Sequence, residues 1–241
     1  MKKFVSLIIV ALLCLSFCSC AEKTHTEIEP ADYNVRFQTD EFDENGCHVT
    51  LSYPVVSGLQ NDAEINDLLY AYVYNRYKIK CLVSESGDVE FNYTTLNTAV
   101  TYSMKGYFCA LIFVEYYSDN ASHNMREGFA VHCDTAEARI YSSSDIINDF
   151  GGIKKQFTAG KFSEQYGMTD LTSVVSYEDL IAQYDESYDL FPQIYFEDGV
   201  FAMNIDVVHL YGGYAGFATD IGNVSKYLNK EIRFVATICG E

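Results

Sequence analysis

Two neighbouring segments rich in aromatic and β-branched residues constrain the fold more than any other feature of the sequence. Residues 89–102 (VEFNYTTLNTAVTY) and 107–117 (YFCALIFVEYY) are separated only by residues 103–106 (SMKG). Such residues favour strands, and a short polar linker with a glycine favours a turn. The two segments are therefore expected to pair as a long antiparallel hairpin.

A strand and a helix are expected before this hairpin. Residues 47–53 (CHVTLSY) alternate in polarity and predict a strand that ends at Pro54. Residues 61–78 predict a helix with one buried face, because apolar residues recur at steps of three and four. Asn61, with Glu64 three residues later, resembles a capping box. The apolar positions are Ile65, Leu68, Leu69, Tyr72, Val73 and Tyr77.

The rest of the chain predicts shorter elements. A strand is expected at residues 128–132, followed by a helix from Ser144 that Gly151-Gly152 interrupt or end. Ser176 is expected to cap a short helix, and Asp198-Gly199 to form the turn of a hairpin. A short helix at 223–228 and a terminal strand at 231–238 complete the prediction. Strands outnumber helices and are mostly connected as hairpins. The predicted class is α+β, with antiparallel hairpin-rich sheets, a few packing helices and two small halves.

The amino-terminal residues have the anatomy of an export signal. Lys2 and Lys3 precede an apolar run over residues 4–17, which is too short to span a bilayer comfortably. The run ends in residues 18–20 (CSC), which resemble a bacterial lipoprotein cleavage site. Cys20 is the expected lipidated residue, because the small Ser19 precedes it. An ordinary cleaved signal and an uncleaved anchor are the alternatives.

The expected division of the chain follows from this signal. Residues 1–19 are the signal peptide and residues 20–32 a polar tether, followed by an N-terminal half (33–120) and a C-terminal half (121–241). The protein would then lie outside the cytoplasm of a bacterium, in the cell envelope, anchored to a membrane by lipid.

Charge limits the class of partner. The 241 residues include 16 Lys and Arg against 34 Asp and Glu, so the net charge is −18, and loss of Lys2 and Lys3 with the signal would make it −20. This excess of acid argues against binding to nucleic acid or to an anionic membrane surface, and it favours a cationic partner.

Five cysteines remain in the chain after Cys20, and they show no metal-ligand spacing. Burial as thiols in apolar strands is the favoured interpretation, although an exported location permits up to two disulfides among them. They are Cys47, Cys81, Cys109, Cys133 and Cys239. No cofactor or metal is expected, because a core of this size needs neither.

Two loops supply candidate ligand-binding residues. His123 and Asn124 lie in a polar loop (residues 119–124) between two strands, where a scaffold can hold side chains towards solvent; an ordinary hairpin loop is the alternative. His209 precedes a segment with three glycines among aromatic residues, which suits stacking on a sugar or peptide ring. A tight glycine corner would explain the same segment. Its candidate residues are Tyr211, Tyr214 and Phe217.

No catalytic motif is present in the sequence. There is no G-x-S-x-G, no H-E-x-x-H and no dinucleotide-binding glycine pattern. Carboxylates such as Glu41, Asp43, Glu44 and Asp206 could meet in the fold, but a solvated acidic surface is the favoured interpretation.

Several segments in order resemble the exported domain of unknown function shared by the lysozyme-sensing anti-sigma factor RsiV and the peptidoglycan deacetylase PdaC. They are residues 53–59 with Asn61 and 65–66, residues 121–123, 133–135 and 144–147, and residues 201–208, 212–216 and 227–228. The resemblance covers most of residues 33–230 and implies a noncatalytic extracytoplasmic binding module. We therefore expect a lipid-anchored module that recognises an envelope polymer or a basic protein such as a lysozyme. An envelope hydrolase with a carboxylate or histidine site is the alternative.

Overall fold

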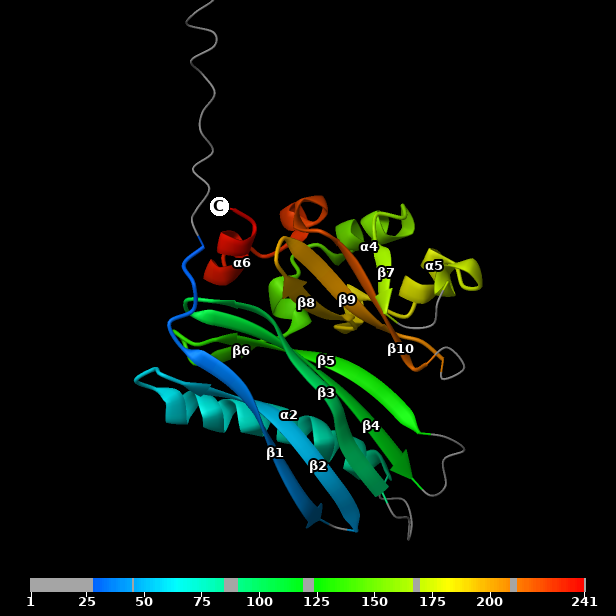
Figure 1. The fold of residues 1–241 in the computed structure, drawn as a ribbon. Coiled ribbons are helices and arrows are strands. Elements are labelled where there is room, and N and C mark those ends of the chain that lie inside the picture. The colour runs from blue at the N-terminus through cyan, green and yellow to red at the C-terminus, as the bar shows by residue number, and fades with distance from the viewer. Residues whose placement is uncertain are drawn as a thin grey trace, which may run out of the picture.

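The structure is a computed structural model that describes residues 28–44, 46–84, 91–118, 124–166, 170–208 and 212–240. Its strands form a six-stranded mixed sheet and a four-stranded antiparallel sheet, and helices pack against both (Figure 1). The predicted α+β class is therefore confirmed. The expected signal peptide and Cys20 lie outside the described residues. Within those residues, no helix combines the length and apolar character needed to cross a membrane.

The six-stranded sheet follows the chain order from β1 to β6. Its neighbouring strands are antiparallel, except that β2 and β3 run parallel over residues 47–50 and 91–94. A parallel pair needs a crossover connection, and helix α2 (Asp62–Ser84) lies in that connection. The strands are β1 (Asn34–Glu44), β2 (Cys47–Ser57), β3 (Phe91–Met104), β4 (Tyr107–Ser118), β5 (Met125–Asp134) and β6 (Arg139–Tyr141).

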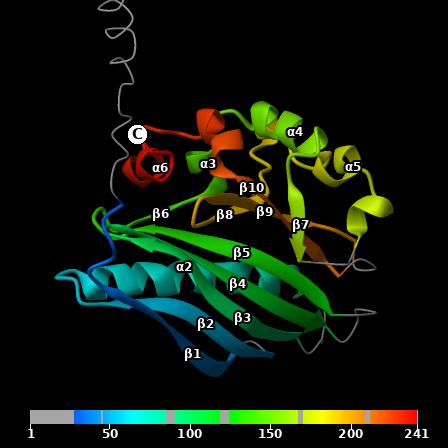
Figure 2. The ribbon, with the colours of Figure 1, turned by 45° about the horizontal axis from the view of Figure 1, so that its top comes forward.

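The second sheet has the order β7-β10-β9-β8. It lies on the face of the six-stranded sheet opposite to α2, and short helices surround it (Figure 2). Its strands are β7 (Ser163–Tyr166), β8 (Gln193–Glu197), β9 (Val200–Asp206) and β10 (Tyr214–Asp220), and the helices are α3 (Ser143–Ile146), α4 (Phe150–Thr158), α5 (Tyr177–Ile181) and α6 (Arg233–Ile238). Single 3₁₀ turns are η1 (Leu171–Ser173), η2 (Glu186–Tyr188), η4 (Ile221–Asn223) and η5 (Ser225–Tyr227).

Strand β4 divides its side chains between two hydrophobic cores. The even-numbered residues from Phe108 to Ile112 pack in the core that contains α2, whereas the odd-numbered residues from Tyr107 to Leu111 pack in the core that contains the second sheet. Successive side chains of a strand point to opposite faces of the sheet. The division expected between residues 120 and 121 falls inside this sheet, between β4 and β5.

Helix α2 confirms the helix predicted at residues 61–78 and continues to Ser84. Its buried face is a stripe with four-residue spacing, as expected for an amphipathic helix against a sheet. The stripe consists of Ile65, Leu69, Val73, Tyr77 and Cys81. At its start, the Asp62 carboxylate accepts the backbone N–H groups of Gly58 and Leu59 at 3.0 and 2.9 Å.

Strand β2 does not end at Pro54, as the sequence predicts, but continues to Ser57. Ser52 and Val56 donate their N–H groups away from β1, to Thr95 Oγ1 and Asn66 Oδ1. Pro54 has the same orientation because backbone groups alternate along a strand. Beyond residue 50, β2 does not pair with β3, so the missing N–H of proline removes no ladder hydrogen bond.

Three of the predicted local elements are confirmed. The long hairpin is β3 and β4, and a turn with Gly106 at φ +81° connects them. Asp198-Gly199 joins β8 to β9 as a two-residue hairpin. The Ser176 side chain accepts the N–H of Asp179 and caps α5.

Gly151 and Gly152 do not interrupt a helix, because both lie in the first turn of α4. A Cβ atom on Gly152 would lie 2.1 Å from the ring of Tyr227. Glycine at this position therefore permits close contact between α4 and η5, and the helix breaker of the sequence is a packing residue in the structure.

The predicted terminal strand at residues 231–238 is wrong, because residues 233–238 form helix α6. Phe234 and Ile238, four residues apart, are buried on one side of this helix. The ring of Phe234 stacks on Tyr107 with a centroid distance of 3.8 Å. Local strand propensity is weak compared with such packing, so the tertiary contact decides the conformation.

The described chain contacts the fold before Tyr33, inside the expected tether. Lys105 donates its backbone N–H to the carbonyl of Glu29 at 3.0 Å, and its Nζ lies 2.7 Å from Glu29 Oε2. Residues near Glu29 are thus held against the turn between β3 and β4.

Candidate functional site

The structure describes three of the six predicted ligand-binding residues. His123, His209 and Tyr211 lie outside the described residues. Asn124, Tyr214 and Phe217 have different environments.

Asn124 is exposed and lies beside a charged pair at the start of β5. Its Nδ2 donates to Glu115 Oε1 at 2.7 Å, and Arg126 Nε donates to Glu115 Oε2 at 2.8 Å. The hydrogen bond from Arg126 lowers the pKa of Glu115 below its ordinary value. Asn124 thus sits on an ordered polar surface with its amide directed at a carboxylate.

Tyr214 is half-buried where β10 begins next to β5. Its ring stacks on Phe113 with a centroid distance of 4.9 Å and meets Tyr166 edge-on at 6.0 Å. A Cβ atom on the preceding Gly213 would lie 3.1 Å from the carbonyl oxygen of Arg126. The glycine segment therefore makes a close backbone approach, as a tight corner would.

Phe217 is fully buried, so its ring is not available to a ligand in this conformation. It meets Phe157 edge-on with a centroid distance of 5.1 Å and contacts Tyr177 at 6.1 Å. The alternation of strand β10 turns Phe217 towards the helices that cover the second sheet. This residue belongs to the core rather than to a binding surface.

A polar cleft opens where α2, β5 and the second sheet meet. Its first hollow has a volume of about 290 Å³, and the second has about 430 Å³. Asp206 and Val207 line both hollows, so the two form one continuous cleft. The first hollow is lined by Lys80, Tyr116, Met125, Arg126, Glu127, Asp206, Val207 and Gly213, and the second by Val175, Asp179, Leu180, Gln183, Asp206, Val207 and Val208.

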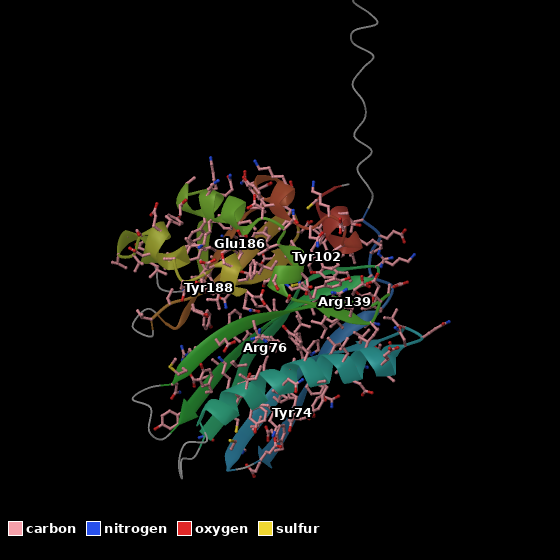
Figure 3. All side chains as sticks on the ribbon, turned by 180° about the vertical axis from the view of Figure 1, so that it is seen from behind. Tyr74, Arg76, Tyr102, Arg139, Glu186 and Tyr188 are labelled. Carbon is pink, nitrogen blue, oxygen red and sulfur yellow. The ribbon has the colours of Figure 1, made fainter. Side chains whose placement is uncertain are left out.

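Glu127 is the charged centre of the first hollow. Arg76 Nη1 lies 2.9 Å from Glu127 Oε1, and Lys80 Nζ lies 2.6 Å from Glu127 Oε2. Both cations come from one side of α2, since they are four residues apart. Figure 3 shows Arg76 directed towards the second sheet, whereas Tyr74 lies on the other side of the helix.

Arg76 also connects the two layers. Its Nη2 donates to Gln193 Oε1 at 3.3 Å, and its guanidinium lies over the Phe129 ring at 4.5 Å. Burial lowers the pKa of Lys80, but the adjacent Glu127 carboxylate outweighs burial and raises it overall. Lys80 therefore stays charged near neutral pH.

Asp206 faces this network from the end of β9. Loss of hydration in the cleft raises the pKa of Asp206, and the charge of Glu127 raises it further, while Lys80 and Arg76 act in the opposite direction. Its backbone is held by Gln183, whose Nε2 donates to the Asp206 carbonyl at 2.7 Å. The residue is exposed and lies where the two hollows adjoin.

The first hollow offers hydrogen-bonding and charged side chains, whereas the second is lined mostly by apolar surface. Among the described residues that line it there is no Ser, Cys or His to act as a nucleophile or a neutral-pH base. The described part of the chain also contains no group of three or more His, Cys, Asp or Glu side chains that could hold a metal ion.

The other carboxylates considered in the sequence do not join Asp206. Glu44 lies 2.5 Å from Lys78 Nζ and accepts the hydroxyl of Tyr74 at 2.8 Å. Asp43 lies 2.9 Å from His48 Nδ1. These acids at the end of β1 have local partners, so no common acidic site forms.

A larger hollow of about 630 Å³ lies at the opposite end of the six-stranded sheet, by the turn between β3 and β4. Its charges have partners in the fold: Lys105 pairs with Glu29, and Arg233 lies 3.9 Å from the buried Asp134. The cleft around Glu127 is the better candidate, because Gly213 lines it and Asn124 precedes Met125 in its lining.

Sequence reasoning did not identify Arg76, Lys80 and Glu127. The four-residue spacing of the two cations on a predicted helix was visible, but such spacing is common on solvated helix faces. The acid that they share lies 51 and 47 residues further along the chain. Only the tertiary structure brings the three together.

Solved structures provide the comparison that bears on the fold. A crystal structure of a DUF3298 family member from Bacteroides fragilis NCTC 9343 matches with a TM-score of 0.53 and 12% identity, covering 86% of this chain and 98% of that one. This chain has the fold of that protein. The family is one of domains of unknown function. A DUF3298 family protein from Pseudomonas aeruginosa PAO1 has a TM-score of 0.48 and 8% identity, with 83% and 95% covered. No family model and no curated protein matches the chain.

Proposed function

We propose that the protein is a lipid-anchored, extracytoplasmic binding module of the bacterial envelope that recognises a cationic protein. The export signal with Cys20 supports the location, and the resemblance to the RsiV and PdaC domain supports a noncatalytic role. The fold shared with a DUF3298 domain is compatible with both.

The observation that carries the proposal is the charge of residues 162–225, the second-sheet unit. Between Phe162 and Ser225 there are eleven Asp and Glu residues and no Lys or Arg. Nine of these acids are exposed. Helix α4, which contacts α5, carries Lys154 and Lys155, so this part of the surface has an excess of acid rather than a single sign of charge. Such an excess attracts a cationic partner from a distance and speeds association.

Exposed apolar side chains accompany this charge. Tyr188 is 76% exposed, Val174 is 61% exposed and Leu190 is 50% exposed. Glu186 and Tyr188 lie near each other in this unit (Figure 3). Aromatic residues are enriched in protein interfaces, where they contribute buried area beside polar contacts. An acidic surface with exposed apolar groups therefore favours a basic protein over an envelope polymer.

Binding of lysozyme by the full chain in detergent tests the proposal. Saturable binding at roughly 50 mM salt that weakens several-fold at roughly 300 mM is expected, because salt screens exposed charges. Glu178→Lys on α5 is expected to weaken binding roughly three- to tenfold. Glu41→Lys on β1 makes the same charge change on the other sheet and serves as the matched control.

The results separate the possible partners. Loss of affinity in Glu178→Lys but not in Glu41→Lys supports recognition through the second-sheet unit. Equal loss in both variants indicates a net-charge effect without a specific surface. Saturable binding of soluble peptidoglycan fragments without binding of lysozyme would replace the proposed partner with an envelope polymer.

An envelope hydrolase is the second candidate, and Asp206 is the observation in its favour. A carboxyl group with a raised pKa beside a second carboxylate is a candidate general acid. Turnover of peptidoglycan fragments that is lost in Asp206→Asn would establish this alternative. A chain that binds such fragments and returns them unchanged supports the binding module.

A further inference from the structure

We propose that Cys47 and Cys81 form a disulfide that fixes helix α2 to strand β2. Their Sγ atoms lie 2.7 Å apart, and the two side chains are 4% and 1% exposed. A disulfide bond has a length of about 2.05 Å, so the bond requires a displacement of well under 1 Å.

The other two buried cysteines of the same sheet lack this geometry. Cys109 on β4 and Cys133 on β5 lie on neighbouring strands, but Cys109 packs in the second-sheet core and Cys133 in the α2 core. Their side chains therefore point to opposite faces of the sheet. Proximity of sulfurs is thus specific to Cys47 and Cys81 among these four residues, and it does not follow from cysteine content alone.

The surroundings of the pair favour a structural bond over a reactive thiol. Both sulfurs are in the core formed by α2 and the sheet, with Tyr77 one helical turn before Cys81. Reactive cysteines are usually partly exposed and electropositive. A bond here would close a loop between residues 34 apart, which restricts the unfolded chain, and would join the end of α2 to the start of β2.

The oxidation needs an external disulfide of the glutathione or thiol oxidoreductase class. The Cys47 thiolate, formed by loss of a proton, attacks one sulfur of that disulfide and releases the other as a thiolate. The Cys81 thiolate then attacks the mixed disulfide, which forms the Cys47–Cys81 bond and releases the second oxidant thiolate. Two protein thiols are oxidised, and two oxidant thiols are produced after protonation. Because both residues are buried in the folded protein, the bond forms before or during folding.

Refolding of the full chain in a mixture of oxidised and reduced glutathione tests the bond directly. After acid quenching, alkylation in denaturant and proteolysis, mass spectrometry is expected to find one species in which the peptide with Cys47 is joined to the peptide with Cys81. Its mass should be lower by two hydrogen atoms than the sum of the two peptides with free thiols. Recovery of both cysteines as alkylated peptides would overturn the proposal. This result does not depend on export, so a chain found unlipidated in the cytosol refutes the proposed location and leaves the refolding result unchanged.

A stability measurement provides a second readout. The refolded protein is expected to melt roughly 5–15 °C lower after reduction. Cys47→Ser and Cys81→Ser are expected to abolish this dependence on reductant. Cys133→Ser, in the same core, is the matched control and should keep it. An equal response to reductant in all three variants would contradict the pairing.

Discussion

Two fully buried tyrosines on opposite faces of the six-stranded sheet differ in their hydrogen bonding. The Tyr107 hydroxyl lies 2.8 Å from His132 Nδ1, and His132 Nε2 lies 2.8 Å from the Ile194 carbonyl. A carbonyl only accepts, so Nε2 carries the proton, and in the neutral ring Nδ1 accepts from Tyr107. On the other face, the Tyr77 hydroxyl has no hydrogen-bond partner among the described residues.

This difference shows how the two layers are specified. Between the sheets, a hydrogen-bonded chain from Tyr107 through His132 reaches β8, so polar groups determine the relative position of the sheets. Beneath α2, Tyr77 meets Phe42 and Tyr93 edge-on at 5.9 and 5.5 Å, and ring packing determines the fit. Burial raises the pKa of Tyr77, so its hydroxyl stays neutral.

The largest expected effect comes from the second-sheet core. Phe217→Ala removes a fully buried ring and should lower the free energy of unfolding by roughly 3–5 kcal/mol, measured by urea denaturation. Tyr214→Ala, at the half-buried end of the same strand, should cost clearly less. A stable Phe217→Ala variant that loses only ligand binding would show that this ring is not a core residue.

Removal of the Tyr107 hydroxyl tests the polar connection between the sheets. Tyr107→Phe keeps the ring stacked on Phe234 but leaves His132 Nδ1 buried without its donor. The free energy of unfolding should fall by roughly 1–3 kcal/mol. If stability is unchanged, the hydrogen bond does not contribute to joining the layers.

The matched change on the α2 face should have the opposite sign. Tyr77→Phe removes a buried hydroxyl that lacks a hydrogen-bond partner in the described structure, so stability should stay the same or rise by up to about 1 kcal/mol. The same urea titration compares it with Tyr107→Phe. A loss as large as that of Tyr107→Phe would remove the distinction between the two layers.

The smallest effects are expected at Asp206 in the cleft where the layers meet and at Glu115, which is paired with Arg126 beside it. The pKa of Asp206 is raised in the folded protein, so its charged form lowers the free energy of unfolding above that pKa. Asp206→Asn should therefore raise the melting temperature at pH 7. The pKa of Glu115 is lowered in the folded protein, so its charged form stabilises the fold at pH values above the ordinary pKa of the group. Glu115→Gln should therefore lower the melting temperature. Each shift should be under about 3 °C.

The pH dependence gives the control for this pair. The difference in melting temperature between each variant and the unchanged protein should shrink with acidification. For Asp206→Asn it should shrink as pH falls from the raised pKa to the ordinary value. For Glu115→Gln it should shrink as pH falls from the ordinary value through the lowered pKa. Differential scanning fluorimetry from pH 7 to pH 3 measures them. Shifts that persist undiminished at the acid end would show that they do not arise from charge.

Elements with a strong local pattern were predictable from sequence. The apolar stripe of α2 has helical spacing, and the segments of the β3–β4 hairpin are rich in aromatic and β-branched residues on either side of a short linker with a glycine. These local patterns separate helix from strand. The misassigned segments are those where a long-range contact overrides propensity. Pro54 lies in the part of β2 that does not pair with β3. Gly152 leaves room for the ring of Tyr227. Phe234 lies in a helix, where its ring packs on Tyr107.

The candidate site was predictable only in part for the same reason. Gly213 lines the cleft, and Asn124 precedes Met125 in its lining, whereas Phe217, three residues after Tyr214, lies in the core. One residue of register decides which face a strand residue occupies. The sequence of one strand alone does not define its register against the strand that pairs with it.

The sequence by itself determined the alternating strands, the amphipathic helix, the acidic character of residues 162–225 and the α+β class, because these depend on neighbours along the chain. Only the tertiary structure decided that Arg76, Lys80 and Glu127 meet in one cleft and that Cys47 lies against Cys81. The physical reason is that contacts between residues 34 or more positions apart depend on how the sheets and α2 pack, and local interactions carry no information about that packing.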